Sequence, residues 1–314
     1  MEIVITDGYT LNPGDLSWDA FHSLGTIEYY DRLAIDEVAD RCKNASVIIT
    51  NKTPINRQSI EAASHLKLIA VTATGYNIID IVAAREKGVN VCNVPEYGTD
   101  SVAQHCFALL LELTNHTGIQ AASVKSGDWV TAADWTYVQK PLIELKNKTL
   151  GIIGFGRIGR RTAELARAFG MQVIYYGGRS GADWAEALSL QEVFERSDVV
   201  SLHCPLKPDN LGFVNKELLS RMKPTAFLLN TSRGQLIHEH ELADALNNNT
   251  IAGAALDVLS QEPPLANNPL LSAANCIITP HNAWICFEAR SRLIQTTFDN
   301  VAAALNGHPQ NLVN

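Results

Sequence analysis

A glycine-rich turn between an apolar run and a helical pattern limits this chain to few folds. The run covers residues 149–153, the turn reads Gly154-Phe155-Gly156-Arg157-Ile158-Gly159, and the apolar residues that follow recur at helical spacing. In a G-x-G-x-x-G turn, Gly154 permits a tight bend, Gly156 lets a pyrophosphate approach the backbone, and Gly159 lets the helix pack on the strand. The helix N-terminus offers N–H groups and a positive dipole to the diphosphate. The pattern predicts a dinucleotide site with residues 154–159 as cofactor contacts.

The residues at the end of the next apolar run indicate whether NAD(H) or NADP(H) binds. Sites specific for NAD place a carboxylate there to accept the ribose 2′-OH. Here the run 172–176 leads into Gly177-Gly178-Arg179-Ser180, and no acidic residue comes before Asp183. Arginine and serine can bind a 2′-phosphate, which a carboxylate would repel. The sequence therefore favours NADP(H), with Arg179 and Ser180 as contacts, and leaves open an NAD(H) site that lacks its usual acid.

Short apolar runs alternate with helical patterns, which predicts an α/β fold with parallel sheets covered by helices on both faces. The alternation breaks after residue 98, because residues 99–126 hold two helical stretches and 127–148 contain no convincing strand. The 314 residues also correspond to about two domains of ~150 residues. We therefore expect two α/β units. The runs interpreted as strands are 2–6, 26–30, 46–50, 67–72, 89–92, 149–153, 172–176, 198–202, 225–230, 251–256 and 276–279, and the helical patterns include 17–24, 35–42, 56–64, 80–88 and a last helix over 286–305.

Composition and charge narrow the possible partners. The net charge is −8 and no window is rich in lysine and arginine, which argues against nucleic acid and anionic membrane surfaces as partners. The longest apolar stretch, 102–113, is interrupted by polar residues and is about half a membrane span. We expect no signal peptide, because the apolar start at residues 1–5 leads into a charged, turn-rich segment. The six cysteines show no close spacing, so we expect reduced thiols, no metal site and a cytoplasmic location.

Four ordered motifs resemble those of the D-isomer-specific 2-hydroxyacid dehydrogenases, over essentially the whole chain. Segments 11–15, 73–77 and 97–104 look most like the hydroxypyruvate and glyoxylate reductases of that family, which are also called glycerate dehydrogenases. The resemblance implies reduction of a small 2-keto acid, with hydroxypyruvate or glyoxylate favoured, to the D-2-hydroxy acid. The four motifs are the glycine turn, Asn230-Thr231-Ser232-Arg233-Gly234, Asp257 through Glu262-Pro263-Pro264, and Pro280-His281-Asn282-Ala283-Trp284.

The resemblance also implies a domain plan. A Rossmann nucleotide domain, residues 99–286, would be inserted into a flavodoxin-like substrate-binding domain made of residues 1–98 and 287–314. Both domains would be doubly wound parallel sheets, and the keto acid would bind in the cleft between them. Members of the family form homodimers through the nucleotide domain, so a homodimer is expected here.

Two candidate site residues follow from their positions in the sequence. Arg233 and His281 each come just after an apolar run, at the carboxyl ends of strands, where α/β sheets bind ligands. A guanidinium matches a carboxylate bidentately, and an imidazole can deliver a proton near neutral pH. We expect Arg233 to anchor the substrate carboxylate and His281 to protonate the ketone oxygen. Among the other histidines, His203 and His105 are the nearest rivals to His281.

Further roles are implied by the resemblance alone. The carboxylate that matches Glu262 bonds the histidine ring, orients it and holds its proton. The residue that matches Asp257 contacts the nicotinamide amide, and Thr231 belongs to a cofactor-binding motif. The backbone N–H groups of Thr74 and Gly75 match a loop that binds the substrate carboxylate.

Some features depart from the family pattern. Residues 130–140 differ from the segment expected in the glycerate dehydrogenase branch, so a bulkier substrate such as an aryl-pyruvate stays open. Asn282 is unusual beside His281, and we have no physical account of it. A third possibility is a dinucleotide-sensing interaction protein on the same fold, similar to the C-terminal-binding-protein corepressors.

Overall fold

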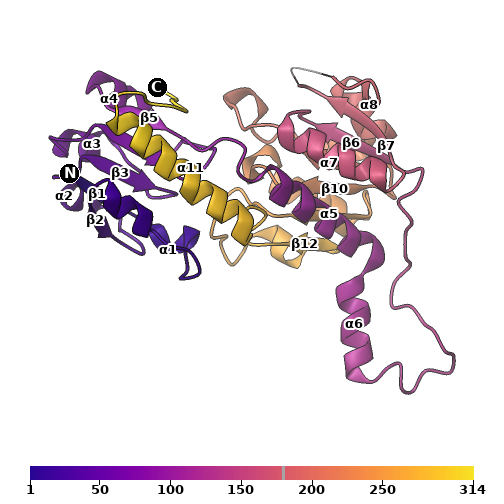
Figure 1. The fold of residues 1–314 in the computed structure, drawn as a ribbon. Helices are drawn as coiled ribbons and strands as arrows, with labels where there is room; N and C mark the ends of the chain where they lie inside the picture. The colour runs from indigo at the N-terminus through magenta and orange to yellow at the C-terminus, as the bar shows by residue number, and fades with distance from the viewer. Residues whose placement is uncertain (179–180) are drawn as a thin grey trace. The chain divides into compact units, whose positions relative to one another are not determined.

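The computed structural model describes residues 1–178 and 181–314, which form two compact units. Unit 1 comprises residues 1–98 and 285–314, and unit 2 comprises residues 99–284. The two ends of the chain therefore fold together in unit 1, as the indigo and yellow segments of Figure 1 show. The sequence analysis placed the second boundary at residue 287.

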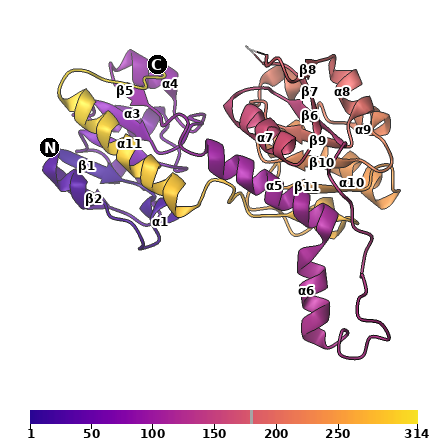
Figure 2. The same ribbon diagram turned by 45° about the vertical axis from the view of Figure 1, so that its right-hand side comes forward.

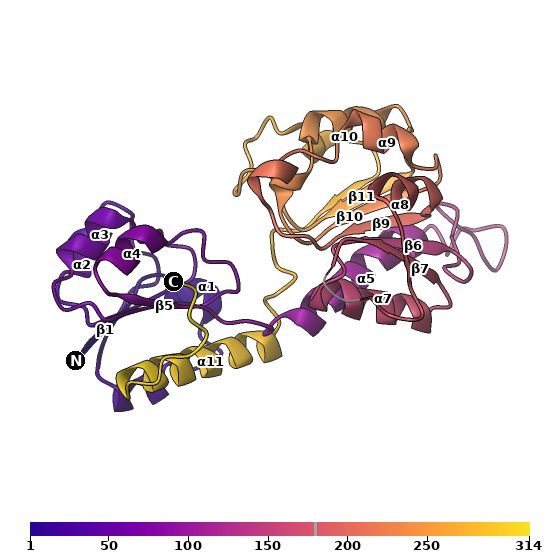
Figure 3. The same ribbon diagram turned by 90° about the horizontal axis from the view of Figure 1, so that it is seen from above.

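Unit 1 is built on a five-stranded parallel sheet in the order β2-β1-β3-β4-β5, the strand order of flavodoxin. Helix α11 packs on one face through Ile294, Phe298 and Val301, and α2, α3 and α4 cover the other face (Figure 3). Asn56 and Asp80 begin α3 and α4 by accepting hydrogen bonds from backbone N–H groups of the first turn. The bounds are β1 (Glu2–Ile5), α1 (Gly8–Leu11), β2 (Thr26–Tyr29), α2 (Val38–Arg41), β3 (Val47–Thr50), α3 (Arg57–Ala62), β4 (Leu68–Val71), α4 (Ile81–Glu86), β5 (Asn90–Cys92) and α11 (Phe287–Leu305).

Unit 2 is built on a seven-stranded parallel sheet in the order β12-β11-β10-β9-β6-β7-β8. Counted from β6, this is the doubly wound order 3-2-1-4-5-6 with one strand added at the edge. Helices α5 and α7 pack on one face (Figure 2), and α8, α9 and α10 cover the other. The bounds are α5 (Thr99–Asn115), α6 (Thr117–Ser126), β6 (Thr149–Ile153), α7 (Arg157–Ala168), β7 (Gln172–Tyr176), β8 (Glu186–Ala187), α8 (Leu190–Arg196), β9 (Val199–Leu202), α9 (Lys216–Arg221), β10 (Phe227–Asn230), α10 (Glu239–Asn247), β11 (Gly253–Leu256) and β12 (Cys276–Ile278).

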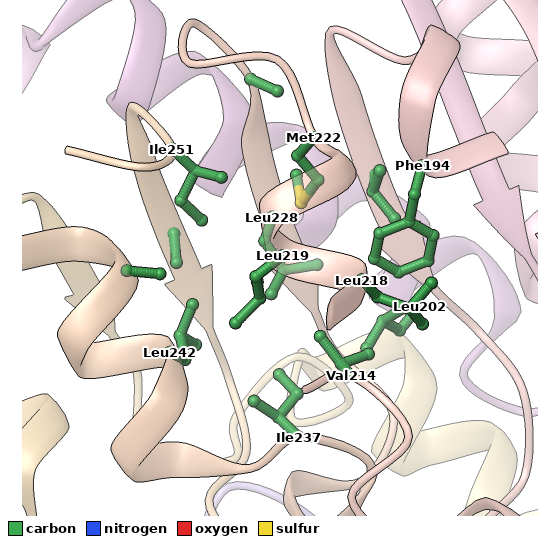
Figure 4. Close-up of a cluster of buried hydrophobic side chains, with 14 of the residues drawn as sticks. Phe194, Leu202, Val214, Leu218, Leu219, Met222, Leu228, Ile237, Leu242 and Ile251 are labelled. Carbon is green, nitrogen blue, oxygen red and sulfur yellow. The ribbon is translucent and has the colours of Figure 1, made fainter. Parts of the chain in front are cut away.

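The larger apolar core of unit 2 lies between its sheet and α8, α9 and α10. Phe194 of α8, Leu219 of α9 and Leu242 of α10 meet Leu228 of β10 in this cluster (Figure 4). Each of these side chains is almost completely removed from water. Because both faces of the sheet are buried, its strands read as continuous apolar runs rather than as alternating patterns.

The predicted fold class is confirmed, since both sheets are parallel and carry helices on both faces. Two local features differ from the expectation. Residues 17–24 form only a short 3₁₀ helix (Asp19–Ser23). The short edge strand β8 was not predicted, because its two residues are exposed and carry no apolar run.

The state of the cysteines and the apolar character of the helices were used to predict the cellular location. All six cysteines are free, and burial raises the pKa of Cys42 and of Cys92 to about 12, so both stay protonated near neutral pH. Within residues 1–178 and 181–314, no helix combines the length and apolar character needed to cross a bilayer. The cytoplasmic location stays a prediction.

Candidate active site

The three glycines of the turn after β6 meet different surroundings. A Cβ on Gly154, whose φ is +98°, would lie 2.6 Å from the backbone nitrogen of Cys204. A Cβ on Gly159 would lie 2.3 Å from the carbonyl oxygen of Gly154. A Cβ on Gly156 would meet no atom of the described residues within 4 Å. Gly154 and Gly159 are therefore required by the fold, whereas the space beside Gly156 is open to a ligand.

A second observation also fits a bound dinucleotide. Thr231 follows β10, and its hydroxyl oxygen is buried with no hydrogen-bond partner among the described residues. A buried polar group without a partner is costly, so a ligand that hydrogen-bonds to it would be favoured. Within the turn itself, the Phe155 ring stacks on Tyr175 with the ring centres 4.3 Å apart. The Phe155 side chain therefore belongs to the core, and only its backbone could contact a cofactor.

Substitution of these glycines should separate the requirements of the fold from those of the ligand. Gly159→Ala should lower the free energy of unfolding by ~3 kcal/mol, because its Cβ would overlap a backbone oxygen. Gly156→Ala should cost no more than ~1 kcal/mol, the typical penalty for alanine at a helix N-cap. Urea unfolding without cofactor measures both values. We expect Gly156→Ala to fold yet bind the dinucleotide at least ~10-fold more weakly, which corresponds to ~1.4 kcal/mol. Equal losses of stability in the two variants would contradict this division.

The strand end that should bind the ribose is held against the glycine turn. Gly154 donates its backbone N–H to the carbonyl of Tyr176, at 2.8 Å, and Phe155 donates to that of Gly177, at 2.7 Å. Gly177 and Gly178 both have positive φ values, +72° and +142°, which residues other than glycine rarely adopt. The two predicted 2′-phosphate contacts, Arg179 and Ser180, lie outside the described residues.

Arg233 lies in the loop after β10, which Asn230 holds in place. Asn230 is fully buried, its amide oxygen accepts hydrogen bonds from the backbone N–H and the hydroxyl of Ser232, and its amide nitrogen donates to the carbonyl of Arg233 at 2.9 Å. The Arg233 guanidinium is half-buried and donates to the carbonyl of Ser232 at 2.7 Å. Sequence reasoning missed this role of Asn230, although a polar residue that ends a fully apolar strand was a usable signal.

Gly234 packs the Arg233 loop against the segment that carries Glu262. A Cβ on Gly234 would lie 1.9 Å from the carbonyl carbon of Leu259, so no other residue fits there without movement of the backbone. The backbone N–H of Leu259 in turn donates to Glu262 Oε1 at 3.1 Å. This contact explains why glycine follows Arg233, and the sequence alone did not predict it.

His281 and Glu262 form a direct pair. His281 Nδ1 lies 2.6 Å from Glu262 Oε2, and the two side chains are 25% and 37% exposed. Glu262 follows β11 and His281 follows β12, and these strands are neighbours in the sheet. With Nδ1 directed at the carboxylate, Nε2 is the ring nitrogen available to exchange a proton with a substrate.

Asp257 does more in this structure than the resemblance implied. Its side chain is 1% exposed, and its carboxylate accepts hydrogen bonds from the Thr279 hydroxyl at 2.6 Å and from the backbone N–H groups of Asn282 and Ala283, both at 2.9 Å. Asp257 therefore anchors the loop that carries His281. The predicted contact with the nicotinamide amide stays a prediction.

The rival histidines have other surroundings. Removal of His203 from solvent lowers its pKa to about 4, so its ring is neutral near pH 7, and Nε2 lies 2.8 Å from the Ser201 hydroxyl. His105 lies on α5, with Nε2 3.0 Å from the Thr279 hydroxyl. Of the three histidines, His281 is the one paired with Glu262 at the strand ends.

Thr74 and Gly75 belong to unit 1, whereas Arg233, Glu262 and His281 belong to unit 2. The Thr74 hydroxyl donates to the carbonyl of Val94 at 2.9 Å, and Asn93 donates its side-chain N–H to the Thr74 carbonyl at 2.7 Å. These bonds hold the loop after β4 in one conformation. The contact of Thr74 and Gly75 with the substrate carboxylate stays a prediction.

The glycine turn at the start of α7 and the His–Glu pair at strand ends are typical of dehydrogenases that use a nicotinamide dinucleotide. Comparison with known proteins specifies the family. The model of the D-isomer specific 2-hydroxyacid dehydrogenase NAD-binding domain matches residues 107–283. The chain belongs to the D-isomer-specific 2-hydroxyacid dehydrogenase family.

Individual relatives are similar over most or all of their length. A hydroxypyruvate reductase of Blautia hydrogenotrophica is 45% identical over 100% of both chains. A glycerate dehydrogenase of Methylorubrum extorquens is 37% identical over 91% of both chains. Among solved structures, an acyclic imino acid reductase in complex with NADPH and D-Arg superposes with a TM-score of 0.88 at 30% identity, over 100% of both chains.

Proposed function

We propose that this protein reduces a small 2-keto acid, with hydroxypyruvate or glyoxylate favoured, to the D-2-hydroxy acid by hydride transfer from NAD(P)H. The observation that carries the proposal is the 2.6 Å contact between His281 and Glu262 at the carboxyl ends of neighbouring strands. The identity to a hydroxypyruvate reductase and to a glycerate dehydrogenase supports the choice of a small substrate.

The site residues divide the tasks of this reaction among them. The Arg233 guanidinium and the backbone of Thr74 and Gly75 bind the substrate carboxylate. A dinucleotide held by the glycine turn of residues 154–159 would supply a hydride for C2 of the keto acid. His281 gives the proton on Nε2 to the ketone oxygen, and the Glu262 carboxylate stabilises the ring in its protonated form before that transfer. Asp257 holds the backbone around His281 so that Nε2 keeps its direction.

One panel of initial rates tests the function. Glyoxylate, hydroxypyruvate, pyruvate and phenylpyruvate are each offered with NADH and with NADPH. The proposal expects the highest kcat/KM with hydroxypyruvate or glyoxylate. A preference for phenylpyruvate would favour the bulkier aryl-pyruvate, and no turnover with any of the four would favour a dinucleotide-sensing protein.

We propose NADP(H) as the favoured cofactor, with NAD(H) as the alternative. Support comes from β7, which is followed by two glycines and then Arg179 rather than by a carboxylate. A structural relative was also solved with NADPH. Residues 154–159, Thr231 and Asp257 are the remaining proposed cofactor contacts, and the dinucleotide domain would comprise residues 99–286.

Arg179→Ala should raise the Kd of NADPH by ~10–100-fold and leave that of NADH nearly unchanged. The reason is that an arginine bound to a 2′-phosphate contributes ~1.5–3 kcal/mol, and NADH has no such phosphate. Binding is measured by the quenching of protein fluorescence. Arg221→Ala is the control, because it removes an exposed arginine of the same unit that pairs with Glu195. An equal loss of affinity for both cofactors in Arg179→Ala would contradict the 2′-phosphate role.

We propose that the protein is a homodimer and that α6 with the following segment, residues 127–142, forms part of the interface. This segment extends away from the rest of unit 2 (Figure 1). Large apolar side chains that face solvent are typical of interaction sites. Those of the segment and their exposed fractions are Trp129 52%, Val130 88%, Trp135 86%, Val138 60% and Leu142 53%.

The double substitution Val130→Ser and Trp135→Ser should weaken the dimer by ~10²-fold or more, since a buried tryptophan often contributes at least ~2 kcal/mol to an interface. Light scattering after size-exclusion chromatography measures the mass. Val82→Ser changes an exposed valine of unit 1 and should leave the mass unchanged. A dimer of unaltered affinity in the double variant would place the interface elsewhere.

A further inference from the structure

His281 has an unfavourable backbone conformation. Its φ is +52°, in the left-handed region that residues with a side chain rarely adopt. Such a conformation persists only where the surrounding structure holds it, and it is often found at functional sites. The backbone N–H of His281 lies 2.8 Å from the carbonyl of Asp257 and 3.0 Å from that of Thr279. The direction of the His281 ring therefore depends on the segment from Thr279 to Ala283.

Helix α5 contacts this segment at two points. The Ser101 hydroxyl donates to the carbonyl of Ala283 at 2.6 Å, and His105 Nε2 lies 3.0 Å from the Thr279 hydroxyl. Ser101 and His105 are four residues apart, so they share one face of the helix. The two contacts bracket His281 in the sequence, one on each side.

The hydrogen bonds of Thr279 determine the role of His105. A hydroxyl has one proton, and that of Thr279 points to Asp257 Oδ1 at 2.6 Å. The Thr279 oxygen must therefore accept a hydrogen bond, which makes His105 Nε2 the donor. His105 thus holds Thr279 in the rotamer that donates to Asp257, and the Asp257 carboxylate binds the backbone N–H groups of Asn282 and Ala283.

We propose that Ser101 and His105 are positioning residues for His281. They act from α5 through Thr279, Asp257 and Ala283, and neither needs to touch the substrate. The inference rests on the proposed function, in which His281 is the proton donor. It assigns to α5 the task of keeping the His281 ring aligned with the ketone oxygen.

Kinetics test the inference first. His105→Phe keeps the bulk of the ring and removes the N–H donor, so kcat should fall by ~10–100-fold, the typical cost of a small misplacement of a catalytic group. KM and the Kd of the cofactor should change little. The primary isotope effect, measured with a cofactor deuterated at the transferred hydrogen, should rise because chemistry becomes slower. His105→Gln retains an N–H donor and should recover part of kcat, and His240→Phe, at an exposed site on α10, is the control.

Three smaller substitutions provide the same test if His105→Phe misfolds. Thr279→Val removes the hydroxyl that links His105 to Asp257 and should lower kcat in the same way, whereas Thr279→Ser keeps the hydroxyl and should retain most of it. Ser101→Ala removes the second contact. Unchanged kcat in Thr279→Val, or the same loss in Thr279→Ser, would overturn the role of the hydroxyl chain.

A spectroscopic measurement separates this inference from the proposed function. The His281 Nδ1 proton, bonded to Glu262 at 2.6 Å, should give a strongly downfield proton resonance, identified by its loss in His281→Ala. His105→Phe and Thr279→Val should shift or broaden it, and His240→Phe should not. An unchanged resonance in both variants would overturn the inference even if the enzyme is active. If the wild-type protein reduces no 2-keto acid, the proposed function fails and the resonance still decides whether α5 positions His281.

Discussion

His281→Ala should lower kcat by ~10²–10⁴-fold, the usual contribution of a positioned general acid. The ketone oxygen becomes an alkoxide as C2 receives the hydride, so the oxygen needs a proton at that moment. In this structure that proton can come from Nε2 of a ring whose other nitrogen is bonded to Glu262. The Kd of the cofactor should stay close to the wild-type value, because the glycine turn proposed to bind the diphosphate lies at the end of a different strand, β6.

Stopped-flow measurement of hydride transfer, together with fluorescence titration of NADPH, gives both quantities. Glu262→Gln serves as the matched variant, because the amide can still accept a hydrogen bond from Nδ1 but cannot stabilise a charged ring. Its kcat should lie between those of the wild type and His281→Ala. A near-normal kcat in His281→Ala would show that His281 is not the proton donor. Another histidine would then be the candidate for that role.

Arg233→Ala should lower kcat/KM for the keto acid by ~10²–10⁴-fold. Two charge-assisted hydrogen bonds to a carboxylate contribute ~1.5–3 kcal/mol each, and every 1.4 kcal/mol is a factor of ten. The guanidinium is suited to this task because the loop that carries it is held by the buried Asn230 and by the contact of Gly234 with Leu259. The loss should appear with every 2-keto acid, since all share the carboxylate.

The variant Arg233→Lys tests whether the planar guanidinium is needed or whether a positive charge is enough. Lysine keeps the positive charge but not the planar fork, so it should recover only part of the activity. Arg221→Ala, which removes an exposed arginine, should keep wild-type kinetics. Near-normal kcat/KM in Arg233→Ala would mean that another group binds the carboxylate.

The dinucleotide turn was predictable because its requirements are local. Strand, turn and helix follow one another in the chain, so the spacing of Gly154, Gly156 and Gly159 already assigns a task to each glycine. The surroundings of the glycines agree with this assignment, because Gly154 and Gly159 have no room for a side chain and Gly156 does. The fold class was predictable for a similar reason, since strand runs and helix periods are read within short windows.

The contacts that hold the proposed catalytic residues in place were not predictable in the same way. Gly234 is small because Leu259, which is distant in sequence, packs against it, and a sequence window around Gly234 contains no sign of that contact. Ser101 and His105 lie on a helix that precedes the His281 loop by well over one hundred residues, and both contact it directly. Asp257 likewise anchors the backbone of Asn282 and Ala283.

The parallel α/β fold class, the position of the dinucleotide turn, and Arg233 and His281 as candidate site residues were all evident from the residues of the chain, and the family resemblance added Glu262. These depend on apolar periodicity and on motifs whose parts are close in the chain. Only the tertiary structure decided that His281 pairs with Glu262 at 2.6 Å, that its backbone is held in the left-handed region, and that α5 holds the segment around it. The physical reason is that hydrogen bonds and close packing act over a few ångströms in space, between residues whose separation along the chain does not indicate whether they meet.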